Sequence, residues 1–319
     1  MRLDTLTASY LLDWILGDPE FLPHPVRLIG HAIQAGERTL RRVGDGPERE
    51  LIGGVLLTGS VVLGSAYAAS KLLRIMKHCN ASLGRAAEVW LAASCMATRN
   101  LLDESQAVLQ ALERSDLDAA RRQLARIVGR DTATLNRNEI ARAVIETLAE
   151  SLSDGIIAPL FYLMLGGVPL AMAYKATNTL DSMIGHRDET YEWFGKAAAR
   201  LDDAANFIPS RIAALLVCGA GALLDLGSFE QAWTTWRLDA QKHASPNAGH
   251  PESAMAGALR VQLGGVNTYR GERVDSPLLG AGFPIPEPHD ARKALRVTAL
   301  ASVLGFGLCC LALAWRRNA

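Results

Sequence analysis

The chain reads Gly155-Ile-Ile-Ala-Pro-Leu-Phe-Tyr-Leu-Met-Leu-Gly-Gly-Val-Pro-Leu-Ala-Met-Ala-Tyr174 between Asp154 and Lys175, a run of 20 residues without a charged side chain. As an α-helix that rises 1.5 Å per residue, this run is about 30 Å long, the thickness of a bilayer's hydrocarbon core. Two further uncharged runs, 51–70 and 297–315, have nearly the same length. The sequence therefore predicts a membrane protein.

The run from 155 to 174 also contains residues that break helices. Pro159 lies near its start, and Gly166-Gly167-Val168-Pro169 divides it in the middle. Glycine pairs followed by proline end helices, and each half is only about 15 Å long as a helix, too short to cross the bilayer. We therefore expect a re-entrant helical hairpin that turns at Gly166 and Gly167 and returns its two flanking polar motifs to the same membrane face.

The rest of the chain alternates between apolar segments and charged connectors, without the period of two that marks exposed sheets. Residues 3–16 are expected to form a helix at the membrane surface, residues 99–129 amphipathic helices outside the bilayer, and residues 241–271 and 276–288 loops. The sequence thus predicts an all-α, polytopic helical membrane protein with amphipathic and re-entrant helices, as a single integral membrane domain over residues 1–319. The candidate membrane segments are 51–70, 155–174, 207–224 and 297–315, of which 207–224 is short for a span.

The composition excludes several classes of protein. The 33 basic residues balance 33 acidic ones, so the chain lacks the basic excess of a nucleic-acid binder. The five cysteines have no paired spacing and are expected to be reduced and buried. The usual nucleotide-binding glycine motifs, zinc clusters and hydrolase signatures are absent from the sequence.

Four polar stretches are dense in functional side chains. A helix expected to start at Asp131 or Thr132 places Glu139, Arg142, Glu146 and Glu150 on one face, which Asp154 continues. This face lies directly before the uncharged run, where charged side chains are costly unless they have a function. A solvated face with ion pairs is the alternative. The four stretches are 16–30, with His24 and Arg27; Arg130 to Thr132 with 146–154; 174–187 with 199–206; and 245–259, with Asn247, His250 and Glu252.

With these four motifs in this order, the sequence from about Tyr10 to Gly280 resembles the CobD/CbiB family of cobalamin biosynthesis, the adenosylcobinamide-phosphate synthases. The resemblance implies an acid–amine ligase of the cell (inner) membrane, multi-pass, that joins adenosylcobyric acid to (R)-1-amino-2-propanol O-phosphate or ethanolamine phosphate. The amide product would be adenosylcobinamide phosphate. ATP and Mg2+ are implied as cofactors. The implied partners are the corrinoid substrate, the amino alcohol phosphate, the lipid bilayer and other cobalamin-biosynthesis membrane proteins, but no nucleic acid.

The chemistry of such a reaction gives the polar residues roles. A protonated amine must lose a proton to a carboxylate before it attacks, and phosphates need cations, here chiefly Arg130, Lys175 and Arg187. The residues assigned to catalysis are Asp181, Glu146, Glu150 and Asp154, with Asp181 and Asp154 also as Mg2+ ligands. The residues assigned to substrate binding are Arg130, Lys175, Asn178, Arg187, His24, Arg27, Asn247, His250 and Glu252.

Structural alternatives stay open for several of these residues. Asp181 and Asn178 also suit a helix cap, Lys175 a membrane-edge anchor and Asn247 a turn. Asp202 and Asp203 fit a solvated helix face beside Arg200. Two other functions compete with the ligase: a non-catalytic membrane sensor or accessory protein of the same superfamily, and a corrinoid transporter.

Overall fold

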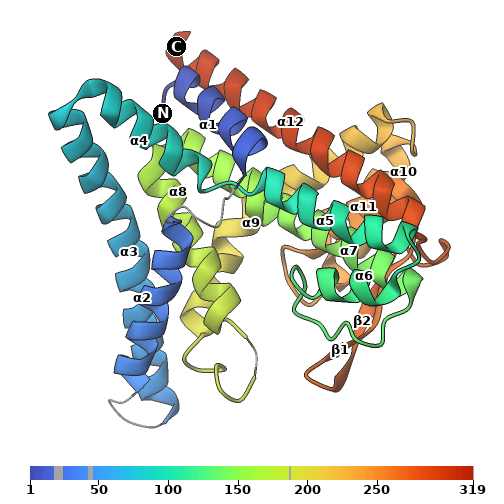
Figure 1. The fold of residues 1–319 in the computed structure, drawn as a ribbon. Coiled ribbons are helices and arrows are strands. Elements are labelled where there is room, and N and C mark those ends of the chain that lie inside the picture. Colours follow the sequence, from blue (N-terminus) through green and yellow to red (C-terminus); the bar gives the residue numbers. More distant parts are fainter. Residues whose placement is uncertain (18–23, 42–45, 187, 319) are drawn as a thin grey trace. The chain divides into compact units, whose positions relative to one another are not determined.

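The computed structural model of the protein describes residues 1–17, 24–41, 46–186 and 188–318. Its helices are, in chain order, α1 Leu3–Leu16, α2 Pro25–Leu40, α3 Pro47–Cys79, α4 Ala81–Ala93, α5 Thr98–Glu113, α6 Leu117–Leu124, α7 Arg137–Leu152, α8 Ala158–Ile184, α9 Lys196–Leu223, α10 Phe229–Asp239, α11 Gly249–Leu259 and α12 Pro288–Asn318 (Figure 1). A π-helical turn, Ser153–Ile157, joins α7 to α8, and a 3-10 turn, Ala240–Lys242, follows α10.

The helical prediction is confirmed, with one exception, a β-hairpin. The predicted loop over 241–271 is also wrong at α11, because Gly249–Leu259 is helical. Strands β1 Leu263–Tyr269 and β2 Glu272–Leu279 pair antiparallel where loops are predicted. The chain turns between them at Arg270 and Gly271, both with positive φ (52° and 83°), as a two-residue hairpin turn that matches the twist of its strands requires.

Four helical stretches of the described residues are long and apolar enough to span a membrane: Pro47–Cys79, Arg137–Ile184, Lys196–Leu223 and Pro288–Arg316. Each contains or overlaps one of the four predicted segments. By length and composition, the chain is therefore a multi-pass membrane protein. The expected helix at residues 3–16 is present as α1, and its place at the membrane surface stays a prediction.

All five cysteines are free, as expected. Cys95 and Cys218 are buried, but the prediction of burial is wrong for Cys79, which is exposed at the C-terminal end of α3.

The chain forms two compact units, each built from separate segments. Unit 1 comprises Met1–Ala97, Ala158–Asn206 and Leu308–Ala319, and unit 2 comprises Thr98–Ile157 and Phe207–Gly307. The core of unit 1 includes Ile33, Leu57 and Phe194, all nearly fully buried. The prediction of a single domain over the whole chain stays a prediction.

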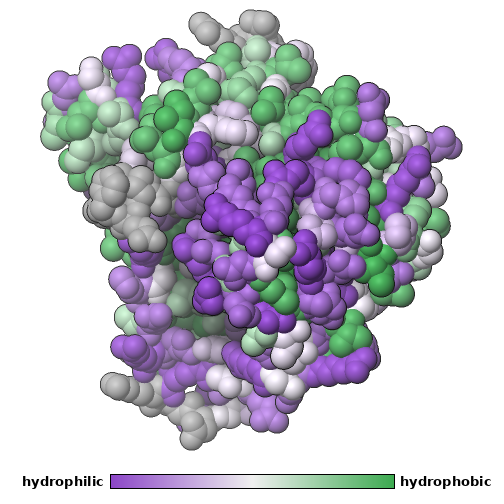
Figure 2. All heavy atoms as spheres, turned by 45° about the vertical axis from the view of Figure 1, so that its right-hand side comes forward, coloured by the Kyte–Doolittle hydropathy of each residue, from purple (hydrophilic) through white to green (hydrophobic). Residues whose placement is uncertain are grey.

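In unit 2, α5 and α6 show the amphipathic pattern that the sequence predicts. Their apolar side chains, such as Leu109, Leu112 and Leu124, are almost completely buried, whereas Asp103 and Arg122 are exposed. Figure 2 shows hydrophilic residues gathered over the face that carries these two helices. This distribution fits helices outside the bilayer.

The helical stretch after residue 158 breaks where the sequence predicts. Gly167 has φ 68° and ψ −161°, and Pro169 follows. The rings of Tyr162 and Tyr174 stack with their centroids 4.9 Å apart, although 12 residues of straight helix would separate them by about 18 Å. The chain therefore bends back sharply at Gly167. That this bend re-enters the membrane stays a prediction.

Replacement of Gly167 with Ala is expected to destabilise the protein by about 1–3 kcal/mol, because its φ and ψ lie in a region that only glycine adopts readily. The matched control is Gly64→Ala in α3, where an added Cβ has no atom within 4 Å and alanine favours helix. Thermal unfolding in detergent measures both. Equal melting temperatures for the two variants would contradict the strained bend.

Candidate functional site

A polar cavity of about 260 Å³ lies in unit 2 between α7, the first turn of α11 and the β-hairpin. Four of the predicted site residues line it: Arg130, Glu146, Glu150 and Glu252. His243, Asn267 and Tyr269, which the sequence did not single out, complete its polar wall.

The buried pair of Arg130 and Glu146 forms the centre of this wall. Arg130 Nη2 donates to Glu146 Oε2 at 2.6 Å, and its Nη1 donates to Asn267 Oδ1 at 2.8 Å. The second carboxylate oxygen, Oε1, accepts from the backbone amide of Gly264 at 2.9 Å. Burial alone would lower the pKa of Arg130, but the charge of Glu146 and the bond to it raise the pKa above its usual value. Arg130 is therefore held in its charged form beside Glu146.

Capping residues at the N-terminus fix α7, the helix that carries Glu146. The expected cap at Asp131 or Thr132 is wrong: Asn136 accepts from the amides of Asn138 and Glu139, and Glu139 closes a capping box. Asp131 instead accepts from the amide of Gly271 at 2.8 Å. The segment before α7 therefore fastens the tip of the hairpin beside the cavity.

Arg142, one turn before Glu146, fixes the other end of the hairpin. Its guanidinium donates to the carbonyl oxygens of Gly264 and Val266 and to Asn267 Oδ1. The solvated-face alternative is therefore wrong for Arg142 and Glu146, because both face protein.

Glu252 is the carboxyl group most affected by its surroundings. Its side chain is only 8% exposed, and His243 Nε2 lies 3.9 Å from its Oε2. Burial raises the pKa of Glu252 well above its usual range, and the charges of Glu146 and Glu150 raise it further, while Arg130 opposes them. Burial also lowers the pKa of His243, which favours the neutral imidazole.

This raised pKa predicts a pH dependence of stability. The folded protein holds the Glu252 proton more tightly than the unfolded chain, so stability falls as pH rises from the ordinary pKa of 4.5 towards the folded pKa, by at most about 1.4 kcal/mol per pH unit. Glu252→Gln removes this contribution, and its melting temperature is expected to fall less than that of the wild type between pH 5 and 8. Parallel melting curves across that range would disprove the shift.

Asn247 and His250 are close in sequence to Glu252, but they are not among the residues that line the unit 2 cavity. Asn247 Oδ1 accepts from Ser210 Oγ at 3.3 Å, and His250 Nδ1 accepts from the indole nitrogen of Trp236 at 2.8 Å. Burial and the charge of Arg211 lower the pKa of His250 to about 4, so its imidazole is neutral near pH 7.

Asp154 lies in the π-helical turn after α7 and is also absent from the lining of the cavity as described. A π-helical turn holds more residues than an α-helical one, and the place of Asp154 on the Glu146 and Glu150 face stays a prediction.

Unit 1 holds a second polar cluster, on α8 and α9. The Tyr174 hydroxyl donates to Asn206 Oδ1 at 2.8 Å, and Asn206 Nδ2 donates to Asp202 Oδ2 at 2.9 Å. Asn178 also bonds to Asp202, whose carboxylate interacts electrostatically with Asp181. The solvated-face alternative is wrong for Asp202, which is 8% exposed, but right for Asp203, which lies 3.7 Å from the exposed Arg200.

The helix-cap alternative for Asp181 and Asn178 is wrong as well, because both lie in the last turns of α8 and not at its start. A carboxylate near a helix C-terminus is unfavourable in the field of the helix. Asp181 is therefore held there against its local preference, which points to a functional role.

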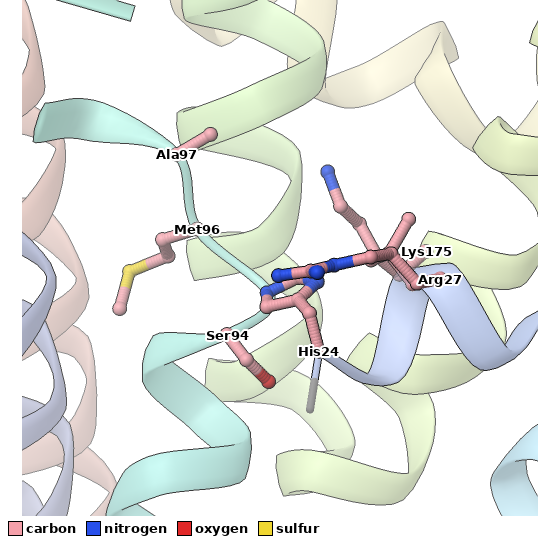
Figure 3. A pocket seen from close by; sticks show the side chains of 7 residues that line it. His24, Arg27, Ser94, Met96, Ala97 and Lys175 are labelled. Atoms are coloured by element: carbon pink, nitrogen blue, oxygen red, sulfur yellow. The ribbon is translucent and has the colours of Figure 1, made fainter. Parts of the chain in front are cut away.

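A cavity of about 570 Å³ in unit 1 brings together His24, Arg27 and Lys175, three residues predicted to bind substrate. Figure 3 shows their side chains around one pocket with Ser94: Arg27 comes from α2, His24 directly precedes it, and Lys175 comes from α8. Such a set of donors suits a phosphate group. Arg187, the remaining predicted cation, lies outside the described residues.

The predicted metal ligands lie in different units, Asp154 in unit 2 and Asp181 in unit 1. No group of three or more His, Cys, Asp or Glu side chains in the described part of the chain is arranged to hold a metal ion. A joint metal role for this pair stays a prediction.

Comparison with known proteins places the chain in a family. The sequence model described as CobD/Cbib protein matches residues 6–298. The chain belongs to the CobD/CbiB family. Among similar CobD/CbiB proteins, the cobalamin biosynthesis protein CbiB of Salmonella typhimurium is 43% identical over 300 residues, 94% of each chain. The cobalamin biosynthesis protein CobD of Geobacter metallireducens is 48% identical over 273 residues, 86% of this chain and 85% of its own. No solved structure matches.

In this CobD/CbiB chain, the polar residues missed from the sequence are those that the hairpin brings to unit 2. Asn267 bonds to Arg130 and Arg142 across more than 120 residues of sequence. Gly271, between two segments with β-branched residues, is a weak signal for a turn between two strands, and it could have placed Asn267 on a strand.

Proposed function

We propose that the protein acts in cobalamin biosynthesis, in the inner cell membrane, as an acid–amine ligase. It joins the free carboxylate of adenosylcobyric acid to the amine of (R)-1-amino-2-propanol O-phosphate or of ethanolamine phosphate, with hydrolysis of ATP, and gives adenosylcobinamide phosphate. Family membership supports the pathway, since the relatives compared are named cobalamin biosynthesis proteins.

The observation that carries the ligase proposal is the group of carboxylates around the unit 2 cavity. An amino alcohol arrives as an ammonium ion, which the acidic side chains at the cavity wall, Glu146 and Glu150, attract. Amide formation then needs an acceptor for the ammonium proton, and a carboxylate whose pKa is raised above its ordinary value is a stronger base for that task. Glu252 meets this requirement, because burial raises its pKa.

The pair of Arg130 and Glu146 has a supporting role in this proposal. It holds the hairpin against α7 through Gly264 and Asn267 and keeps a fixed positive charge near Glu252. At about 260 Å³, the cavity suits a small amino alcohol rather than a corrinoid.

Phosphate groups of ATP are assigned to the cationic cavity of His24, Arg27 and Lys175 in unit 1. Mg2+ bound to substrate phosphates needs only one or two protein carboxylates, so the absence of a three-ligand group in the described residues does not conflict with it. Asp181 and Asp202 would hold the ion in unit 1. Bound Mg2+ would supply positive charge to the phosphates.

The test incubates purified protein with adenosylcobyric acid, aminopropanol phosphate, ATP and Mg2+. The expected product has the summed mass of the two joined substrates less one water, and it forms only when ATP is present. A parallel reaction with ethanolamine phosphate decides between the two amines. Absence of any adduct with well-folded protein would refute the ligase and favour the sensor; ATP-independent uptake of the corrinoid into vesicles without an adduct would favour the transporter.

A further inference from the structure

Arg211 is a charged residue inside the apolar helix α9 that no role described so far uses. It lies 12 residues before Leu223, the end of a stretch long enough to span a membrane, so about 18 Å of helix separates the two. Charged side chains at such depths are rare, face protein or a polar cavity, and mark binding sites or pathways for ions and substrates.

The guanidinium of Arg211 forms no ion pair with a carboxylate among the described residues, and its side chain is only partly buried. Arg130 and Arg142 of the same unit, in contrast, both lie beside Glu146. The polar neighbours of Arg211 carry no negative charge: Ser210 and Asn247 are uncharged, and His250, whose pKa is about 4, is neutral near pH 7.

The position of the guanidinium is nevertheless fixed. It lies over the ring of Phe207, 3.7 Å from the centroid. One nitrogen, Nη1, makes all of its hydrogen bonds to described residues: to the Phe207 carbonyl oxygen at 2.6 Å, Ser210 Oγ at 3.3 Å and Asn247 Oδ1 at 3.4 Å. The edge formed by Nε and Nη2 has no such bond within the described part of the chain.

We propose that this Nε and Nη2 edge of Arg211 binds the phosphate group of a substrate. Two parallel N–H donors on a rigid fork match two phosphate oxygens, and Phe207 and Asn247 hold the fork in place. The choice of substrate rests on the proposed function, since the phosphate belongs either to the amino alcohol phosphate or to ATP. Phosphate binding itself does not depend on the ligase activity.

Equilibrium dialysis of the full-length protein with radiolabelled aminopropanol phosphate, and separately with ATP, tests the proposal. Arg211→Gln is expected to weaken binding of one ligand at least tenfold, and Arg211→Lys less so. The control is Arg237→Gln, because Arg237 is an exposed arginine over a ring, 6.0 Å from the Trp233 centroid, and it should leave both affinities unchanged. Wild-type affinity of Arg211→Gln for both ligands would overturn the proposal.

A measurement on the wild type covers the case in which Arg211→Gln does not fold. Phenylglyoxal modifies accessible arginines, and each ligand's protection of Arg211 and Arg237 is read by peptide mass spectrometry. Protection of Arg211 alone supports the phosphate site, and equal modification of Arg211 with and without ligand rejects it. Because neither binding experiment requires turnover, a protein that forms no adduct but loses phosphate binding on Arg211→Gln would refute the ligase and keep this site.

Discussion

Asp181→Asn is expected to lower the rate of adduct formation by about 100-fold or more while leaving the melting temperature unchanged or higher. Asparagine keeps the shape of the side chain and removes only its charge, which the proposed binding of Mg2+ and phosphates requires. Stability should not suffer, because the carboxylate of Asp202 interacts with that of Asp181 and loses a like-charged neighbour.

Asp203→Asn is the matched control for Asp181. Asp203 is a neighbouring carboxylate on α9 whose partner, Arg200, is 72% exposed. Its charge acts on Asp202 more weakly than that of Asp181, so its loss should lower the rate far less. Adduct formation and melting are measured on the same preparations. An Asp181→Asn variant with near wild-type turnover would remove Asp181 from the site.

Glu146→Gln is expected to destabilise the protein by about 3–5 kcal/mol, because it leaves a buried arginine without its partner. The side chains of Arg130 and Glu146 are only 11% and 7% exposed, so water cannot replace the lost charge. Chemical denaturation in detergent gives the difference. Joint replacement, Arg130→Met with Glu146→Leu, should recover only part of the stability, because the buried Gly264 amide still lacks its acceptor, and it should not restore adduct formation.

Glu113→Gln is the control for this pair. Glu113 forms an ion pair with Arg292 at the surface, where the side chains are 53% and 47% exposed, and such pairs contribute about 0–1 kcal/mol. If Glu146→Gln cost no more than Glu113→Gln, the buried pair would not be the support of the hairpin that the structure indicates.

The sequence predicts the helical part of this fold well, because length and charge patterns are local. The break at Gly166 and Gly167 follows from residues that few helices tolerate, and the structure has its unusual backbone at Gly167. The hairpin is different. Its strands are short, and much of what fixes it is held by Asp131 and Arg142, distant residues whose contacts no local pattern reveals.

The candidate site was predictable to a similar degree. The polar motifs of the sequence predict that His24, Arg27 and Lys175 all bind substrate, and the structure brings the three side chains to one cavity. Helical spacing placed Glu146 and Glu150 on one face, and the structure brings both to the unit 2 cavity. Asp202 was misjudged because a nearby Arg200 suggested an ion pair on the surface, whereas Asn206 holds it in the interior.

The long sequence separations within the unit 2 cavity have a consequence for biosynthesis. Glu146 accepts a hydrogen bond from the backbone amide of Gly264, which lies 118 residues further along the chain. At roughly 5–20 residues per second, a ribosome needs roughly 6–24 s to make that stretch. Throughout this interval α7 already exists, but Glu146 and Arg142 lack their strand partners. Docking of the hairpin is thus a late event, and a nascent chain released before Leu263 carries an unfinished cavity.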